Sequence, residues 1–327
     1  MKQNRAALIA VSLIVIAGPA APEPVDDTLE IDGVVIVTRA TAAEGLPYRE
    51  VLSGWHYREA ETRALQADSF ANPGMLAVER GAEIWETAEG PEGRSCAGCH
   101  GDASESMKTV GARYPTWSDS AGKPRNVELQ IDACRTENLK VEAYPFDHPD
   151  QIALTAFIKH QAMGSTVQLD LDRGGMRDWW RRGEELYYTR HGQLNLACAN
   201  CHEDNNGRYI RADHLSQGNV NGFPTFRLRD GMVSLNNRLR GCFRDVRAEF
   251  PEAFRTIFWR WRSTPHGGAQ AFPWRRRPSG SRAANRLTAF SRRVARRGGH
   301  GPPQMKRVCS CRSIDENSSR PVWGPRP

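Results

Sequence analysis

The sequence predicts a mainly α-helical protein made of two related halves, and three observations support this prediction. The pentapeptide Cys-x-x-Cys-His occurs at 96–100 and again at 198–202, so the copies stand 102 residues apart. An Arg-Gly pair stands at the same distance before each copy, at 80–81 and at 182–183. An aromatic-Pro-Thr triplet and then a lone cysteine follow each copy. Four markers in the same order indicate an internal duplication.

The pentapeptide is the attachment signature of c-type haem. Its two thiols add across the haem vinyl groups, and the adjacent histidine ligates the iron. A zinc half-site is the alternative, but two copies in an exported chain favour haem. The sequence therefore predicts two covalently bound haem c groups in small, mainly helical domains. The residues that bind the cofactor are Cys96, Cys99, Cys198 and Cys201, and the proximal iron ligands are His100 and His202.

The first residues are typical of an exported protein. Lys2 and Arg5 precede an apolar run at 6–17, and small residues follow it. This pattern predicts a cleavable signal peptide at 1–21 and a periplasmic mature chain. The run is too short to span a bilayer, so we expect no membrane span, although a membrane anchor is the alternative interpretation.

The markers divide the rest of the chain into four segments. We expect an N-terminal extension at 22–75, in which the run 29–37 predicts a short strand. A first haem domain at 76–168 would end with a helix that begins at Asp147 as N-cap. A second haem domain follows at 169–249, and a tail occupies 250–327.

Each predicted haem needs a sixth iron ligand or an open position, and a lone cysteine occupies the corresponding place in each half. Cys134 lies 34 residues after His100, and Cys242 lies 40 residues after His202. The spacing allows both cysteines to ligate iron. A disulfide between the two cysteines, free structural thiols, and Met232 as a ligand of the second haem are the alternatives.

The surroundings of the two cysteines differ. Arg238, Arg240 and Arg244 flank Cys242, so we expect a lowered thiol pKa and attraction for a small dianion. Cys134 has one adjacent arginine among acidic residues. The sequence therefore predicts that the chemistry takes place in the second half.

The segments 222–228 and 237–249, together with 130–135 and both haem motifs, resemble the SoxA family of sulfur-oxidation cytochromes over about residues 50–249. The resemblance implies two tandem class I cytochrome c domains and L-cysteine S-thiosulfotransferase activity, which joins thiosulfate to a cysteine of the carrier SoxYZ. It implies a monohaem partner, SoxX, that receives electrons. The axial pairs implied are His100 with Cys134, and His202 with Cys242 at the active-site haem. Cys242 and Arg238 are the catalytic residues implied.

The tail departs from this pattern in composition. Residues 250–327 hold 16 Arg and one Lys against three acidic residues, and they hold no counterpart of the helix predicted after Asp147. A shifted reading frame near residue 250, a disordered basic tail and a folded extra domain are the interpretations. The functional alternatives are a plain dihaem electron-transfer cytochrome and a non-functional frameshifted relative. Nucleic acid is not an expected partner outside the cytoplasm.

Overall fold

The computed structural model describes residues 26–42 and 46–251. The predicted signal peptide and nearly all of the predicted tail lie outside these residues. Within the described ranges the chain is mainly helical, as predicted, and every sheet is a two-stranded antiparallel ribbon. No helix in this part of the chain is long and apolar enough to cross a bilayer.

The N-terminal extension differs from the prediction, because the run expected to form one strand is a hairpin. Strand β1 (Thr28–Ile31) pairs with β2 (Val34–Val37). The chain reverses at Asp32 and Gly33, which have φ values of 50° and 76°, and glycine adopts such values without a steric penalty. The extension continues with β3 (Arg39–Thr41), β4 (Glu50–Leu52), the 3-10 helix η1 (Gly54–Tyr57) and α1 (Ala60–Ala67).

The first half packs two long helices directly against each other. A Cβ on Gly81 in α2 (Met75–Glu86) would lie 2.5 Å from Phe157 Cβ in α7 (Pro149–His160), so only glycine fits at this crossing. The core between and beside these helices includes Ile84, Trp85, Leu154 and Ile158. The intervening elements are α3 (Cys96–His100), α4 (Ala103–Ser106), α5 (Val110–Arg113), β5 (Thr116–Ser118), β6 (Lys123–Arg125), α6 (Val127–Cys134) and the π-helix η2 (Arg135–Leu139).

Helix α7 begins later than the sequence predicted. Its N-cap is His148, whose ring Nδ1 accepts a hydrogen bond from Asp150 N, and Pro149 fills the first helical position, where its missing N–H costs nothing. Asp147 is not the cap. It has a φ of 57°, and its carboxylate accepts a hydrogen bond from Ser234 Oγ in the second half.

Several elements of the first half recur in the same order in the second half. Helix α8 (Met176–Tyr188) corresponds to α2, α9 (Cys198–His202) to α3, and α10 (Leu235–Asp245) to α6. The ribbon of β9 (Thr225–Arg227) and β10 (Gly231–Val233) corresponds to β5 and β6, and a cis aromatic–proline bond precedes both ribbons. The additional ribbon pairs β7 (Tyr209–Ile210) with β8 (Asp213–His214). Up to Pro251, where the description ends, no helix follows α10.

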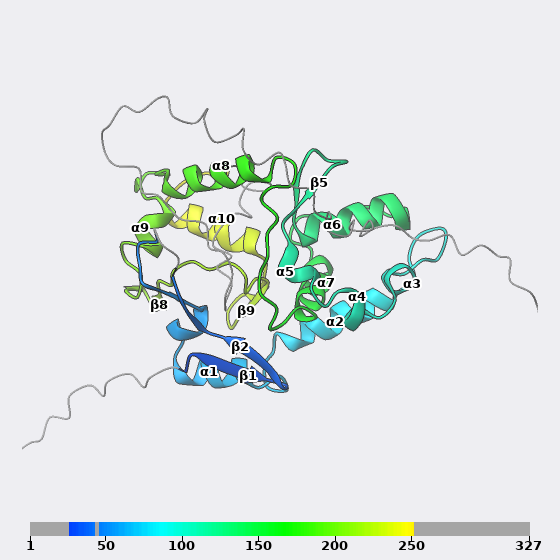
Figure 1. Cartoon of the computed structure of the whole chain (residues 1–327), viewed down its shortest axis with the longest axis horizontal. Helices are drawn as coiled ribbons and strands as arrows, with labels where there is room; N and C mark the ends of the chain where they lie inside the picture. Colours follow the sequence, from blue (N-terminus) through cyan, green and yellow to red (C-terminus); the bar gives the residue numbers. More distant parts are fainter. Residues whose placement is uncertain (1–25, 43–45, 252–327) are drawn as a thin grey trace, which may run out of the picture.

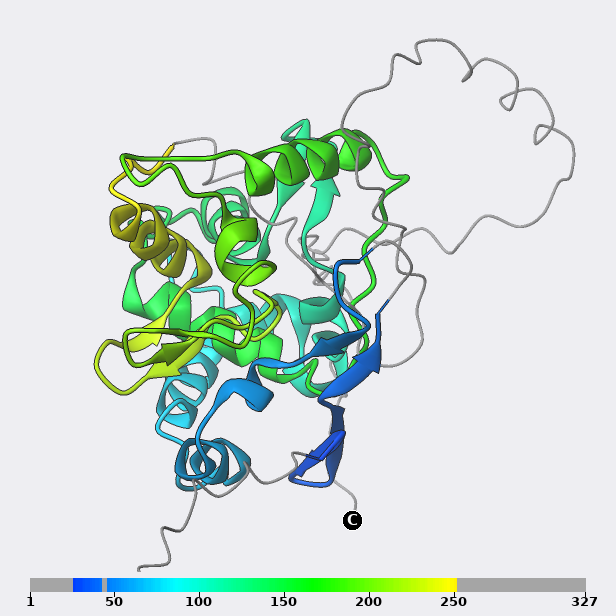
Figure 2. The same ribbon diagram turned by 90° about the vertical axis from the view of Figure 1, so that its left-hand side faces the viewer.

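The two halves lie side by side, and the extension contacts the second half. Lys159 at the end of α7 donates hydrogen bonds to the backbone oxygens of Asn221 and Phe223. Figures 1 and 2 show the N-terminal strands, in blue, beside the green loop that follows α9. The core of the second half is formed by Tyr187, Ala199, Leu235, Leu239 and Phe243.

Candidate haem and substrate sites

A mainly apolar cavity in the first half brings three of the predicted residues together. Cys96, His100 and Cys134 line it, and most of its other lining side chains are apolar. Burial lowers the pKa of His100, which favours the neutral imidazole that ligates metal. The Trp85 ring lies 5.6 Å from the His100 ring, and its Nε1 donates to Gly101 O at 3.2 Å. A mainly apolar cavity lined by one histidine and two cysteines has the side chains that could attach a haem and ligate its iron.

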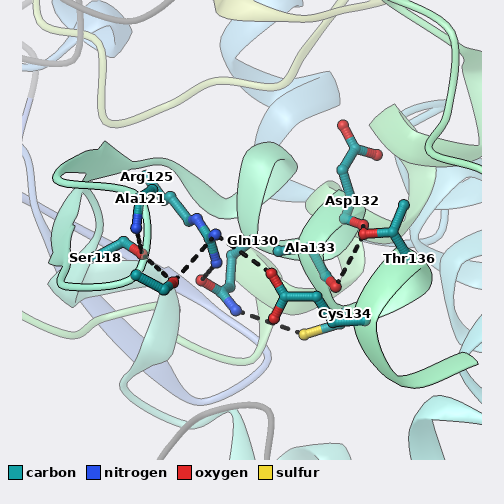
Figure 3. A network of polar contacts seen from close by, with 10 residues as sticks. Ser118, Ala121, Arg125, Gln130, Asp132, Ala133, Cys134 and Thr136 are labelled. Carbon is teal, nitrogen blue, oxygen red and sulfur yellow. Dashed lines mark hydrogen bonds and ion pairs between the residues drawn. The ribbon is translucent and has the colours of Figure 1, made fainter.

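A neutral hydrogen-bond donor faces the sulfur of Cys134 (Figure 3). Gln130 lies one helical turn earlier on α6, and its Nε2 donates to Cys134 Sγ at 3.5 Å. Gln130 Oε1 in turn accepts a hydrogen bond from Arg125 Nη1 at 3.5 Å, and Arg125 also pairs with Glu137. The Gln130 amide therefore contacts both the Arg125 guanidinium group and the sulfur.

The oxidation state of the cysteines divides them into two groups. Cys99 and Cys134 are disulfide-bonded in the structure, whereas Cys96, Cys198, Cys201 and Cys242 are free thiols. A disulfide sulfur is not a thiolate and does not ligate iron as one, so the roles predicted for Cys99 and Cys134 apply to the reduced protein. Because Cys242 is free, the alternative of a disulfide between Cys134 and Cys242 is wrong.

In the second half, a backbone carbonyl fixes the tautomer of His202. The ring Nδ1 lies 2.7 Å from Ser216 O, and a carbonyl oxygen accepts only, so Nδ1 must carry the proton. Nε2 is then the nitrogen with a lone pair for a metal. Burial also lowers the pKa of His202. This arrangement, in which one ring nitrogen is held by an acceptor, is typical of metal-ligating histidines and fits the predicted haem ligand.

Cys242 lies on α10, close to the motif cysteines of the second half. Its thiol influences the pKa of Cys198, which burial and then the charge of Cys242 raise to about 12. Burial raises the pKa of Cys242 itself, and the charges of Arg238 and Arg227 oppose this rise. The lowered pKa expected from the flanking arginines is therefore wrong, because desolvation outweighs the guanidinium charges.

Only one of the three flanking arginines acts on the Cys242 thiol. Arg238 lowers the pKa of both Cys242 and His202. Arg240 instead lies over the Phe146 ring, 5.3 Å from its centroid. Arg244 is exposed and lies 3.8 Å from the Asp245 carboxylate. The predicted cluster is thus reduced to Arg238, because Arg240 and Arg244 are each two positions from Cys242 on the helix and do not face it, whereas Arg238 is four positions away and does.

Two other arginines, which sequence reasoning did not assign, approach the site from elsewhere in the chain. Arg227 on β9 and Arg58 after η1 pair with Asp213, with N–O distances of 3.1 Å and 3.7 Å. Burial lowers the pKa of Arg58, and the charges of Arg227 and Arg238 lower it further. Arg227 also contacts Asp230. Arg227 and Arg58 thus share the Asp213 carboxylate, whereas Arg238 acts on Cys242 against the charge of Asp245.

Met232, the alternative ligand of the second haem, lies elsewhere. It lines a second cavity, between α7 and the β9–β10 ribbon, and its sulfur lies 3.7 Å from where a Cβ on Gly74 would stand. The two histidines nearest to the second motif pack on aromatic rings, His191 on Phe243 at 5.0 Å and His214 on Tyr209 at 3.8 Å. The geometry therefore favours Cys242 over these candidates.

Comparison with known proteins identifies the family. A model of the SoxA/TsdA cytochrome c domain matches residues 80–167. The chain is 62% identical over 242 residues to the L-cysteine S-thiosulfotransferase subunit SoxA of Pseudaminobacter salicylatoxidans, which covers 74% of this chain and 85% of that protein. The chain belongs to the SoxA family. The SoxA subunits of Paracoccus pantotrophus and Rhodovulum sulfidophilum are 43% and 42% identical, over 83% and 88% of their lengths.

A solved structure supports the assignment to the SoxA family. The crystal structure of SoxXA from P. pantotrophus superimposes with a TM-score of 0.67 at 40% identity, over 73% of this chain and 94% of that chain. The predicted cytochrome c fold with mainly helical content is therefore confirmed. Membership of this family also agrees with the side chains that line the first-half cavity, where haem c would be bound.

Proposed function

We propose that this chain is the haem-carrying subunit of an L-cysteine S-thiosulfotransferase that acts in sulfur oxidation. In the overall reaction a carrier thiol and thiosulfate form a new sulfur–sulfur bond, and one proton and two electrons are released. A monohaem cytochrome of the SoxX type would take the electrons, and a SoxYZ-type carrier would supply the cysteine. The observation that carries the proposal is the charge of Arg238, which acts both on the partly exposed Cys242 thiol and on His202, in a chain of the SoxA family.

Each residue of the second site has a distinct part in this reaction. Arg238 offers two parallel N–H donors to the sulfonate oxygens of thiosulfate, which orients the terminal sulfur toward Cys242. Arg227 and Arg58 add positive charge around the same place. A haem at this site would supply an electron acceptor and an iron for His202 and Cys242 to ligate. Burial of Cys242 keeps water from the reacting sulfur atoms.

The first site is proposed as a second haem c site without substrate chemistry. Cys96 and Cys99 would hold the haem covalently, and His100 and Cys134 would ligate its iron. Gln130 takes the place that Arg238 has in the second half, so a neutral amide stands there in place of a guanidinium group. We propose that the two sites arose by tandem duplication, with domains at 76–168 and 169–249 after an extension at 22–75.

The proposal also covers the two ends of the chain, residues 1–21 and 250–327. A signal peptide at 1–21 would export the protein to the periplasm, where thiosulfate and both partners would be met. The segment 250–327 is proposed to result from a shifted reading frame, since its composition departs from that of 1–249. Sequencing the gene across codons 245–260 tests this directly. A frame that encodes a helix followed by a stop would support it, and an unbroken frame confirmed by mass spectrometry would refute it.

Replacement of each lone cysteine by methionine tests the function. Methionine keeps a sulfur ligand for iron but raises the haem potential. We expect Cys242→Met to abolish conjugation of thiosulfate to the carrier while electron transfer to a small cytochrome persists. Cys134→Met is the matched control and should retain conjugation. Conjugation that survives in Cys242→Met would show that Cys242 is not the reactive centre.

A further inference from the structure

The N-terminal extension is bound to the second half through the side chain of Gln217. This residue is 2% exposed, and its amide pairs with β4 as a neighbouring strand would. Leu52 N donates to Gln217 Oε1 at 2.8 Å, and Gln217 Nε2 donates to Glu50 O at 2.8 Å. Both hydrogen-bonding groups of the amide are thereby directed to β4, although 165 residues separate Gln217 from Leu52.

The residue that precedes Gln217 holds the proximal histidine of the second motif. Ser216 O accepts the hydrogen bond from His202 Nδ1 at 2.7 Å. The carbonyl of Ser216 and the N–H of Gln217 belong to the same planar peptide group. Fixing the position of Gln217 therefore limits the direction in which the Ser216 carbonyl can point, and through it the orientation of the imidazole.

Further hydrogen bonds join the same two segments. Asn219 Nδ2 donates to Leu52 O at 2.8 Å, and Tyr57 Oη donates to Asn206 Oδ1 at 2.6 Å. A buried amide without hydrogen-bond partners costs free energy. The Gln217 amide therefore stabilises the contact between β4 and the second half. The extension and the loop after α9 thus behave as one unit around His202.

We propose that Gln217 is a positioning residue for His202. Through the Ser216–Gln217 peptide, the N-terminal extension sets the orientation of the imidazole and the strength of the hydrogen bond at its Nδ1. That hydrogen bond raises the basicity of the opposite nitrogen as a ligand, which stabilises ferric iron and lowers the potential. The inference rests on the proposed role of His202 as a haem ligand.

The test compares Gln217→Leu with Gln151→Leu in the full-length, haem-loaded protein. Gln151 is a matched control because it is 6% exposed and also uses its amide in buried hydrogen bonds, to Glu128 O and Asp132 Oδ1 in the first half. We expect Gln217→Leu to raise the potential of the second haem, alter its low-spin electron paramagnetic resonance signal and speed amide hydrogen exchange at Leu52. The first haem should be unchanged. Gln151→Leu should leave the second haem as it is.

Two outcomes would overturn the inference. One is a folded Gln217→Leu protein in which the second haem keeps its potential and its signal. The other is an equal shift at both haems, which would indicate general destabilisation. If Gln217→Leu does not fold, Gln217→Glu decides, because its carboxylate still accepts from Leu52 N but cannot donate to Glu50 O. It should shift the second haem in the same direction by a smaller amount.

A separate variant tests whether His202 ligates a haem. If His202 does not ligate a haem, His202→Ala will keep the haem signals of the unaltered protein. In that case the proposed function is wrong at this site. If His202→Ala removes the second signal while Gln217→Leu leaves it unaltered, only the role of Gln217 is refuted.

Discussion

Gln130 Nε2 lies 3.5 Å from Cys134 Sγ, and Arg238 occupies the same position relative to Cys242, one helical turn ahead on the corresponding helix. The two halves therefore present their lone cysteines with different donors. A neutral amide faces the sulfur of the first site, whereas a guanidinium group acts on the sulfur of the second. This difference is the reason that the proposed anion chemistry is assigned to the second half, since a charged donor attracts a dianion more strongly than a neutral one.

Replacing Arg238 by glutamine would give the second site the donor of the first. We expect Arg238→Gln to raise the KM for thiosulfate about 10- to 100-fold, because a hydrogen bond to a charged group contributes about 1.5–3 kcal/mol. Steady-state kinetics of carrier conjugation measure this. Arg244→Gln is the control, since Arg244 lies on the same helix but is exposed. An equal effect of both substitutions would contradict a specific role for Arg238.

The N-terminus of α10 depends on a residue that also contacts the first half. Ser234 Oγ accepts from Asn237 N at 3.0 Å and donates to the Asp147 carboxylate. We expect Ser234→Ala to lower the free energy of unfolding by about 1 kcal/mol through loss of the cap, and to raise the KM for thiosulfate because α10 carries Arg238. Urea unfolding and kinetics provide the two measurements.

The matched control for Ser234 is Asn126, which caps α6 by accepting from Leu129 N at 2.7 Å. Asn126→Ala should destabilise the protein by a similar amount without changing the KM. If Asn126→Ala changes the KM as much as Ser234→Ala, the effect is one of stability alone.

The crossing of α2 and α7 leaves no room for a side chain at Gly81. We expect Gly81→Ala to lower the free energy of unfolding by about 1–3 kcal/mol, because the added methyl group would overlap Phe157 Cβ and the backbone of Ala153. Gly54→Ala is the comparison, since no atom lies within 4 Å of the Cβ that it would add. Urea unfolding that ranks Gly54→Ala as the more damaging change would contradict this packing.

The extension should show a dependence of stability on pH through His56. Its Nε2 lies 3.1 Å from Thr38 Oγ1, and burial and then the charge of Arg39 lower its pKa. A lowered pKa means that the folded state binds the proton less tightly than the unfolded state does. The contribution of His56 is therefore present above about pH 6.5 and is lost as the pH falls through the folded-state pKa.

Unfolding measured across that range in the native protein and in His56→Gln provides the test for His56. The glutamine variant lacks the titrating group, so its stability should fall less as the solution is acidified. The charged groups that act on the ring are Arg39, Asp27 and Arg63. Parallel curves for the two proteins would show that His56 does not contribute.

Several features of the fold follow the order of the sequence markers. The two Cys-x-x-Cys-His segments are short helices at the same place in each half. The aromatic-Pro-Thr triplets precede corresponding ribbons, and the lone cysteines lie on corresponding helices. Such features depend on residues close in the chain, and so the spacing of the markers was sufficient to align them.

Two predictions made from local sequence are wrong, because residues far away in the chain determine the structure at those positions. Asp147 has the side chain of an N-cap, but it bonds Ser234 in the other half while His148 caps α7. The arginines around Cys242 suggested a lowered pKa, yet burial by the rest of the fold raises it. Neither burial nor a partner 87 residues away is visible in the sequence around one residue.

By itself, the sequence determined the two Cys-x-x-Cys-His motifs and a mainly helical fold, because covalent motifs and helix periods are local properties. The tertiary structure alone decided what surrounds the reactive sulfur. It brought Arg58 and Arg227 near Arg238, and it used Gln217 to connect β4 with the carbonyl that holds His202. Arg58 and Gln217 each contact a segment more than 150 residues away in the chain, and only the packing of the folded chain sets these distances.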